Sequence, residues 1–195
     1  MRDVQPVGEA RLEDRHYISE IEQLWCRAVD RKDWDLVREV FHPDGYDDHG
    51  MYRGDIDGLI EWLKGRHPSI AFSMHSLCNL LIEFAGEDKA LAEAYIVAYQ
   101  QYLTPAEADH ATLVAALGEE LASRSEPVSV LMPCRYVDEF ERRNEQWRII
   151  RRTTVFESRY LLSTGGPLNF DPQWSIGRRD RDDPYYRIRA RMFGE

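Results

Sequence analysis

Two residues in mostly apolar segments of the chain could together carry out a proton transfer. Asp30 ends a segment whose apolar side chains recur at helical spacing, and His75 lies inside a β-like segment. Imidazole suits the role of a general base because the unperturbed pKa of histidine is about 6.5. A carboxylate bonded to one ring nitrogen would hold the tautomer and stabilise the imidazolium that forms. The two residue types therefore predict base-initiated chemistry if the fold brings them together.

Neighbouring residues could complete such a site. His75 and Asn79 would share one face of a strand, because strand side chains alternate. Arg151 and Arg152 are neighbours, so one of them must point toward the concave side, where it needs an anion. Simpler interpretations remain open. Asp30 could be a surface residue or cap the next helix, His75 could be a hydrogen-bonded core histidine, and Arg152 could lie on a solvated outer face.

Other chemistries find little support in the sequence. Asp47, Asp48 and His49 are rich in metal-ligand atoms, but three consecutive strand residues cannot all face one ion. The chain contains no G-x-S-x-G, P-loop or G-x-G-x-x-G motif. We therefore expect neither a metal site nor a cofactor.

Composition narrows the class of protein. The 195 residues suffice for one substantial domain, and the hydrophobic fraction of 43% allows a real core. A net charge of −10 argues against binding to nucleic acid or to anionic lipid, both of which need a basic face. No apolar signal segment or membrane span is visible, and three widely spaced cysteines favour free thiols in a reducing compartment. The chain is thus predicted to be a cytoplasmic protein.

The elements that would position these residues fall into two blocks. Helical periodicity comes first and β-like segments follow, which is a segregated α+β pattern. A strongly bent antiparallel sheet wrapped over the first helices would bury both sets of apolar side chains. The predicted helices are 10–31, 33–41 and 55–66, the last with Asp55 as its N-cap, and a helical insertion is predicted at 105–124. The predicted strands are 46–52, 69–84, 89–103, 128–142 and 146–160.

The C-terminal part differs from the rest. We predict one domain over residues 1–164 and an extension over residues 165–195 that is charged and loop-like. A disordered tail would rarely carry so many aromatic residues. The extension is therefore expected to pack on its own domain or on a neighbouring subunit. Its aromatic residues are Phe170, Trp174, Tyr185, Tyr186 and Phe193.

Several motifs together resemble the SnoaL-like domains of the nuclear-transport-factor-2-like superfamily. Residues 136–149 (YVDEFERRNEQWRI) resemble the family's hairpin, Y-x-D-x-F-x-R-x-x-G-x-W-R-I, with Glu145 replacing the turn glycine. Residues 28–33 resemble its helix end, V-D-x-x-D, and residues 45–54 its first strand and turn. The resemblance covers most of residues 15–160. It implies a cone-shaped α+β barrel of the cystatin-like type.

The pattern is similar to the family branch that contains scytalone dehydratase, bile-acid 7α-dehydratase and hexachlorocyclohexane dehydrochlorinase. Those enzymes pair an aspartate at the end of the first helix with a histidine on the following long strand. The resemblance implies that His75 is the base, that Asp30 is its partner, and that Arg152 stabilises an anion or Asp30. It also implies a substrate-binding group consisting of Trp25, Tyr46, Asn79, Tyr136 and Asp138.

The activity implied by this resemblance is that of a small-molecule lyase, a dehydratase or dehydrohalogenase acting on a hydrophobic or cyclic substrate in an apolar pocket. Isomerase or polyketide-cyclase chemistry begins with the same proton abstraction and stays open. So does a non-catalytic role, as a ligand-binding module or an accessory subunit of an oxygenase. Because family members form dimers or trimers, we also expect a homo-oligomer.

Overall fold

The first long helix places Asp30 in its last turn. The computed structural model describes residues 11–162 and 175–193. Helix α1 (Leu12–Arg31) buries an apolar stripe that includes Ile18 and Trp25. The helix ends where Lys32 adopts a left-handed conformation (φ 55°) and its N–H bonds to the carbonyl of Ala28. This sharp ending leaves Asp30 buried on the side of α1 that faces the sheet.

Two shorter helices follow, each begun by an aspartate. Helix α2 (Trp34–Glu39) starts after Asp33, whose carboxylate accepts a hydrogen bond from the N–H of Leu36. Helix α3 (Ile56–Arg66) starts after Asp55, which accepts from the N–H of Gly58 at 2.8 Å. The predicted N-cap is therefore confirmed. A short 3-10 turn, η1 (His67–Ser69), connects α3 to the sheet.

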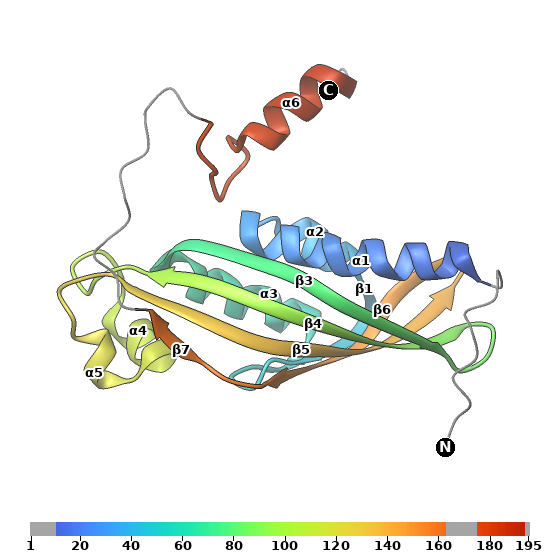
Figure 1. The fold of residues 1–195 in the computed structure, drawn as a ribbon, viewed down its shortest axis with the longest axis horizontal. Coiled ribbons are helices and arrows are strands. Elements are labelled where there is room, and N and C mark those ends of the chain that lie inside the picture. The colour runs from blue at the N-terminus through green and yellow to red at the C-terminus, as the bar shows by residue number, and fades with distance from the viewer. Residues whose placement is uncertain (1–10, 163–174, 194–195) are drawn as a thin grey trace.

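The strands form one strongly curled sheet in the order β2-β1-β6-β5-β4-β3, with β7 paired to β5. The predicted α+β class is confirmed, and the sheet does not close, because β2 and β3 are its two edges (Figure 1). All pairs are antiparallel except β1 with β6, which is parallel. No hairpin joins those two strands, so nothing local imposes the antiparallel arrangement that we predicted for the whole sheet. The strands are β1 (Phe41–Asp48), β2 (Arg53–Asp55), β3 (Ile70–Phe84), β4 (Lys89–Tyr102), β5 (Val128–Arg143), β6 (Gln146–Phe156) and β7 (Tyr160–Leu162).

A β-bulge interrupts the long strand β3. Leu77 pairs with Ile96 of β4 and Leu80 pairs with Ala94, so three steps along β3 match two steps along β4. The extra residue reverses the alternation of side chains. Odd-numbered residues face the concave side before the bulge, and even-numbered residues face it afterwards. Asn79 lies within the bulge and is exposed.

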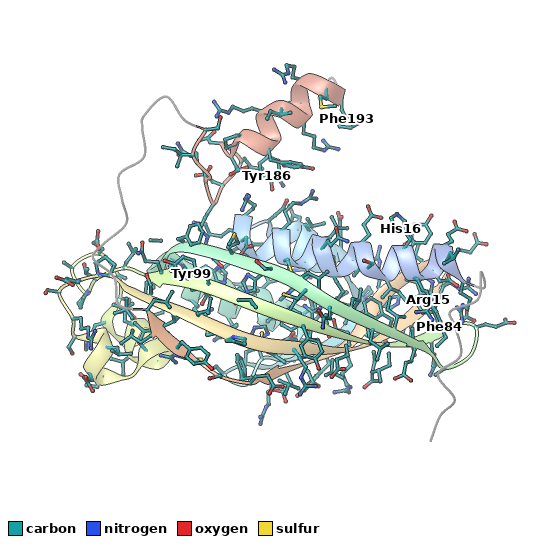
Figure 2. All side chains as sticks on the ribbon, viewed as in Figure 1. Arg15, His16, Phe84, Tyr99, Tyr186 and Phe193 are labelled. Atoms are coloured by element: carbon teal, nitrogen blue, oxygen red, sulfur yellow. The ribbon has the colours of Figure 1, made fainter. Side chains whose placement is uncertain are left out.

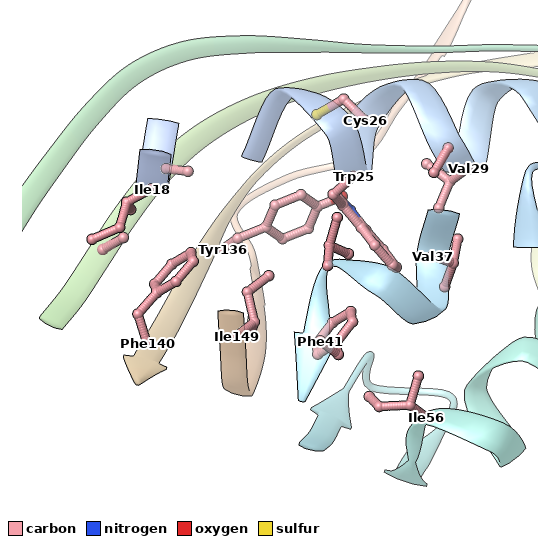
Figure 3. Close-up of a cluster of buried hydrophobic side chains, with 14 of the residues drawn as sticks. Ile18, Trp25, Cys26, Val29, Val37, Phe41, Ile56, Tyr136, Phe140 and Ile149 are labelled. Carbon is pink, nitrogen blue, oxygen red and sulfur yellow. The ribbon is translucent and has the colours of Figure 1, made fainter. Parts of the chain in front are cut away.

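The hydrophobic core has two parts. The larger cluster fills the space between α1 and the sheet with Trp25, Phe41, Tyr136 and Ile149, all at most 1% exposed (Figure 3). The smaller cluster lies at the opposite end of the strands. There the predicted helical insertion forms two helices, α4 (His110–Leu117) and α5 (Glu119–Ala122), which cover that end of the sheet (Figure 1).

The hairpin between β5 and β6 turns through Asn144 and Glu145. Both residues have left-handed backbone angles, with φ of 51° and 62°. Asparagine tolerates this conformation, but glutamate adopts it at a cost because its Cβ approaches the carbonyl oxygen. The missing glycine noted in the sequence therefore leaves local strain in the turn.

The described part of the C-terminal extension contacts α1 and α2 through a few polar side chains. Tyr186 of helix α6 (Pro184–Phe193) lies on the side of that helix facing α1 and α2, whereas Phe193 lies at its far end (Figure 2). The Tyr186 hydroxyl lies 3.4 Å from Asp33, and the Arg27 guanidinium donates to the Tyr185 hydroxyl. The predicted positions Phe170 and Trp174 lie outside the described residues. The domain boundary at 164/165 stays a prediction.

No helix in residues 11–162 or 175–193 combines the length and hydrophobicity needed to cross a membrane.

Candidate active site

Asp30 and His75 meet where the end of α1 lies beside β3. The Nδ1 atom of His75 is 2.7 Å from Oδ1 of Asp30, and the backbone N–H of His75 donates to Oδ2 at 2.8 Å. The Ser73 hydroxyl also donates to Oδ1 at 2.8 Å. Both side chains of the pair are less than 10% exposed. A carboxylate can only accept, so Nδ1 carries the ring proton and Nε2 is left as the basic nitrogen.

The surroundings of Asp30 favour its ionised form. Burial by itself raises the pKa of this carboxyl, and it is the largest single influence. The hydrogen bonds and charge of His75, together with the Ser73 hydroxyl, outweigh it and bring the pKa of Asp30 below its usual value. Asp30 is therefore a carboxylate at neutral pH and can stabilise a positive charge on His75.

A cavity of about 420 Å³ lies under the curled sheet, in the size range of small-molecule sites. His75 lines this cavity, whereas Asp30 stands behind it. No described residue hydrogen-bonds to Nε2 of His75, so that nitrogen remains for a bound molecule. The apolar part of the wall comes from α1, α3, β5 and β6 and includes Trp25, Trp62, Met132, Tyr136 and Phe156.

A second carboxylate-backed imidazole lines the same cavity. His49, just after β1, places Nδ1 at 3.2 Å from Oδ1 of the fully buried Asp47. The Thr154 hydroxyl lies 3.3 Å from the same nitrogen. The ring stands among Trp62 and other aromatic side chains, with centroids 5.7 Å apart for that pair. Within residues 11–162 and 175–193, no group of three or more His, Cys, Asp or Glu side chains is placed so that it could hold a metal ion.

The cavity also contains a thiol, Cys134. Burial raises the pKa of this thiol to about 11. The protonated form therefore dominates at neutral pH, and a thiol in that form is a poor nucleophile. The arrangement does not favour covalent catalysis through Cys134.

Arg152 lies elsewhere than expected. Its side chain is completely buried, with Nε at 2.9 Å from Asp138 and Nη2 at 2.8 Å from Glu22. It neither lines the cavity nor contacts Asp30. The strand register pairs Arg152 with Asp138 across β5 and β6, which determines this partner. Its guanidinium lies 4.1 Å from the ring centre of Tyr136, so the cluster supports the cavity wall from behind.

A comparison with known protein families shows which family this chain belongs to. The model of the SnoaL-like domain matches residues 10–153, which is most of the chain. The chain belongs to the SnoaL-like domain family. No curated protein matches it by sequence.

Solved structures share the fold of this SnoaL-like protein at low identity. A hexachlorocyclohexane dehydrochlorinase superposes with a TM-score of 0.65 at 17% identity, covering 84% of this chain and 96% of that one. A Novosphingobium aromaticivorans protein proposed to be a scytalone dehydratase gives 0.61 at 15% identity, covering 79% and 91%. A Nostoc punctiforme protein with a cystatin-like fold gives 0.51 at 17% identity, covering 75% and 92%. These likenesses establish the fold.

The SnoaL-like fold brings only some of the other predicted residues to the cavity. Trp25 and Tyr136 line it. Tyr46 instead contacts the guanidinium of Arg151, 4.5 Å from its ring centre, and does not line the cavity. The bulge in β3 turns Asn79 away from the His75 face, contrary to the simple alternation that we predicted. Asp138 is held in the cluster with Arg152.

Sequence reasoning missed three cavity residues of this SnoaL-like protein. The first is His49, whose spacing of two from Asp47 on one strand face is the sequence signal that indicates the pair. Arg66 and Gln100 come from the end of α3 and from β4, and both line the cavity. Nothing local in the sequence distinguishes them from surface or core residues.

Proposed function

We propose that this protein is a small-molecule lyase in which His75 removes a proton from a carbon atom of the substrate. The observation that carries the proposal is the 2.7 Å contact between His75 Nδ1 and Asp30 at the wall of an apolar cavity. Because the site is largely shielded from water, the attraction between Asp30 and the imidazolium that forms on His75 is stronger than it would be in solution. The likeness to a dehydrochlorinase fold supports elimination as the reaction class.

In the proposed elimination, His75 is the base. Nε2 of His75 takes the proton, the C–H electron pair becomes the new double bond, and the adjacent bond breaks with its electrons on the leaving group. His49 stands at the same cavity with Nδ1 held by Asp47. A proton on Nε2 of His49 would pass to a leaving hydroxyl, which then departs as water. A halide leaves without this proton.

An isomerase is the second candidate, and the pair of imidazoles favours it specifically. His75 would remove the proton, and His49 would return one to a different carbon, so that a double bond moves without loss of a group. Polyketide-cyclase chemistry begins with the same step. A ligand-binding module or an oxygenase accessory subunit would need the cavity, but it would not need a buried carboxylate behind a cavity-lining imidazole.

Three probes that converge on one product separate these candidates. Dehydration of 3-hydroxycyclohexanone, dehydrochlorination of 3-chlorocyclohexanone and isomerisation of 3-cyclohexen-1-one all yield 2-cyclohexen-1-one, whose conjugated absorbance reports turnover. We expect His75→Gln to lower the rate by about 10²–10⁴-fold, the usual contribution of a general base. Asp30→Asn should also lower it, and the surface variant His16→Gln should not. Turnover that survives His75→Gln, or conversion of 3-cyclohexen-1-one without elimination from either of the other two probes, would contradict the lyase proposal.

We also propose that the protein forms a homo-oligomer, a trimer or a dimer. The convex side of β3 and β4 carries exposed apolar side chains, including Phe72, Met74 and Tyr95 at 41%, 49% and 44% exposure. Burying such a surface against a second copy would be favourable. Light scattering over a range of concentrations tests the proposal, and a monomeric mass throughout would contradict it.

A further inference from the structure

One end of the cavity carries a positive charge that the proposed proton transfer does not use. Arg66, the last residue of α3, lines the cavity, and its Nη2 donates to Oε1 of Gln100 at 3.0 Å and to the hydroxyl of Tyr102. Both partners are neutral. In residues 11–162 and 175–193 no side chain or carbonyl accepts a hydrogen bond from the buried Nε, and no carboxylate forms an ion pair with Arg66. The guanidinium is thus only partly satisfied by the protein.

Other cations reinforce this charge instead of neutralising it. Arg179 reaches in from the C-terminal extension, with Nη2 at 2.7 Å from Nδ1 of His67, next to Arg66. Burial, followed by the charges of Arg66 and Arg179, lowers the pKa of His67 well below its usual value. Burial lowers the pKa of Arg179 to about 10, and Arg66 contributes in the same direction. Arg159 adds another guanidinium to the cavity lining.

The carboxylates near this end already have partners. Asp30 is bonded to His75 and Ser73, and it stands behind the cavity wall. Glu157 lines the cavity, but it accepts from Arg135 at 2.6 Å. A chain with a net charge of −10 therefore keeps an uncompensated cation inside its small-molecule cavity. Arg66 is half-buried and its Nε is fully buried, so an anion bound in the cavity would offset the cost of partly desolvating this charge.

The side-chain amide of Gln100, next to Arg66, is oriented so that it can donate a hydrogen bond into the cavity. Oε1 of Gln100 accepts from both Arg66 and Tyr102, and this fixes which way the amide points. The amide nitrogen donates to no described residue, and Gln100 lines the cavity while being only 2% exposed. Gln100 therefore offers a fixed neutral donor beside the charged donors of Arg66.

We infer that the cavity binds an apolar, ring-sized molecule that bears a carboxylate, and that Arg66 and Gln100 hold this carboxylate. A guanidinium matches the planar, two-oxygen geometry of a carboxylate, and such charge-assisted hydrogen bonds are strong. The carbon skeleton lies against the aromatic wall, which places one of its C–H bonds before His75. This inference rests on the proposed lyase site and specifies the class of its substrate.

Binding measurements with the full chain test the inference without requiring turnover. Isothermal titration with cyclohexanecarboxylate, cyclohexanecarboxamide and cyclohexylphosphonate compares one ring with three head groups. We expect the carboxylate to bind at least 10-fold more tightly than the amide. Arg66→Gln should remove this preference while leaving the affinity for the amide unchanged. Arg38→Gln, a matched change of an exposed arginine on α2, should leave every affinity unchanged.

The outcomes separate this inference from the lyase proposal. Retention of the carboxylate preference in His75→Gln is expected, because that variant removes the base but not the anion site. Equal affinity for carboxylate and amide in the wild type would overturn the inference, even if Arg66→Gln failed to fold. A preference that survives in folded Arg66→Gln, or tighter binding of the phosphonate than of the carboxylate, would overturn it as well.

Discussion

Arg179 donates a hydrogen bond to the backbone carbonyl of Asp30, whose side chain is bonded to His75. Its Nε donates to the carbonyl of Asp30 at 3.0 Å, and its Nη1 donates to the carbonyl of Ile70 at 2.6 Å. These carbonyls belong to the end of α1 and the start of β3, the two elements that carry the pair. One side chain from the C-terminal extension thus connects the segments whose separation determines the distance between Asp30 and His75.

Removing that connection should destabilise the protein. We expect Arg179→Met to lower the free energy of unfolding by about 2 kcal/mol, because buried carbonyls lose charge-assisted hydrogen bonds. Arg181→Met removes a nearby, mostly exposed arginine that pairs with Asp33, and it should cost less than about 1 kcal/mol. Urea unfolding of both variants measures the difference. Equal effects would show that Arg179 contributes no more than a surface ion pair.

Asp30 should make stability depend on pH in the acid range. Its pKa is lowered in the folded protein from an ordinary value of 3.8, so the ionised form is preferred after folding. The stabilisation is present above about pH 4 and is lost as the pH falls through the folded-state pKa. The difference in unfolding free energy between wild type and Asp30→Asn should therefore shrink below pH 4. A difference that is constant from pH 7 to pH 3 would contradict this.

Glu22 should behave in the opposite way. Burial, then the charge of Asp138, raises the pKa of Glu22 well above its usual value, and Arg152 only partly offsets this. A raised carboxyl pKa means that stability is lost as the pH rises from about 4.5. Glu22→Gln removes this loss and still offers an oxygen to Arg152. We expect the variant to be more stable than the wild type at pH 8, by roughly 1 kcal/mol, and to lose this advantage at pH 4.

Asp138→Asn provides the contrast to Glu22→Gln. Arg152 would then lose the carboxyl group that accepts most of its hydrogen bonds while remaining completely buried. Urea unfolding at pH 8 should show clear destabilisation by this substitution. Destabilisation by Glu22→Gln of the same size would contradict the unequal roles of the two carboxyls.

The turn between β5 and β6 should accept glycine with a gain in stability. Glu145 has a φ of 62°, a conformation that costs an ordinary residue about 1–2 kcal/mol and glycine little. We expect Glu145→Gly to raise the unfolding free energy by about 1 kcal/mol, after allowing for the larger entropy of glycine in the unfolded chain. Asn144→Gly should gain less, because asparagine tolerates this conformation. Thermal unfolding of both variants compares them, and destabilisation by Glu145→Gly would refute the strain.

Local sequence patterns were enough to predict most of the helices and strands. They also predicted the Asp30 and His75 part of the site. Helical periodicity and the Asp55 cap depend on residues within a few positions of each other, so the sequence displays them directly. The same reasoning placed Asp30 near a helix end and His75 on a half-buried strand face. The family motifs then indicated that these two elements meet.

What the tertiary structure decided depends on register and on contacts between distant segments. The bulge in β3 turned Asn79 outward, which strand alternation could not anticipate. Arg152 pairs in the interior with Glu22, which is 130 positions away in the sequence. It does not face the cavity, where it could have met an anion. His49 and Arg66 reached the cavity because the sheet curls around it. Local free energies determine where strands and helices form, whereas the packing of the whole chain determines which side chains share one enclosed volume.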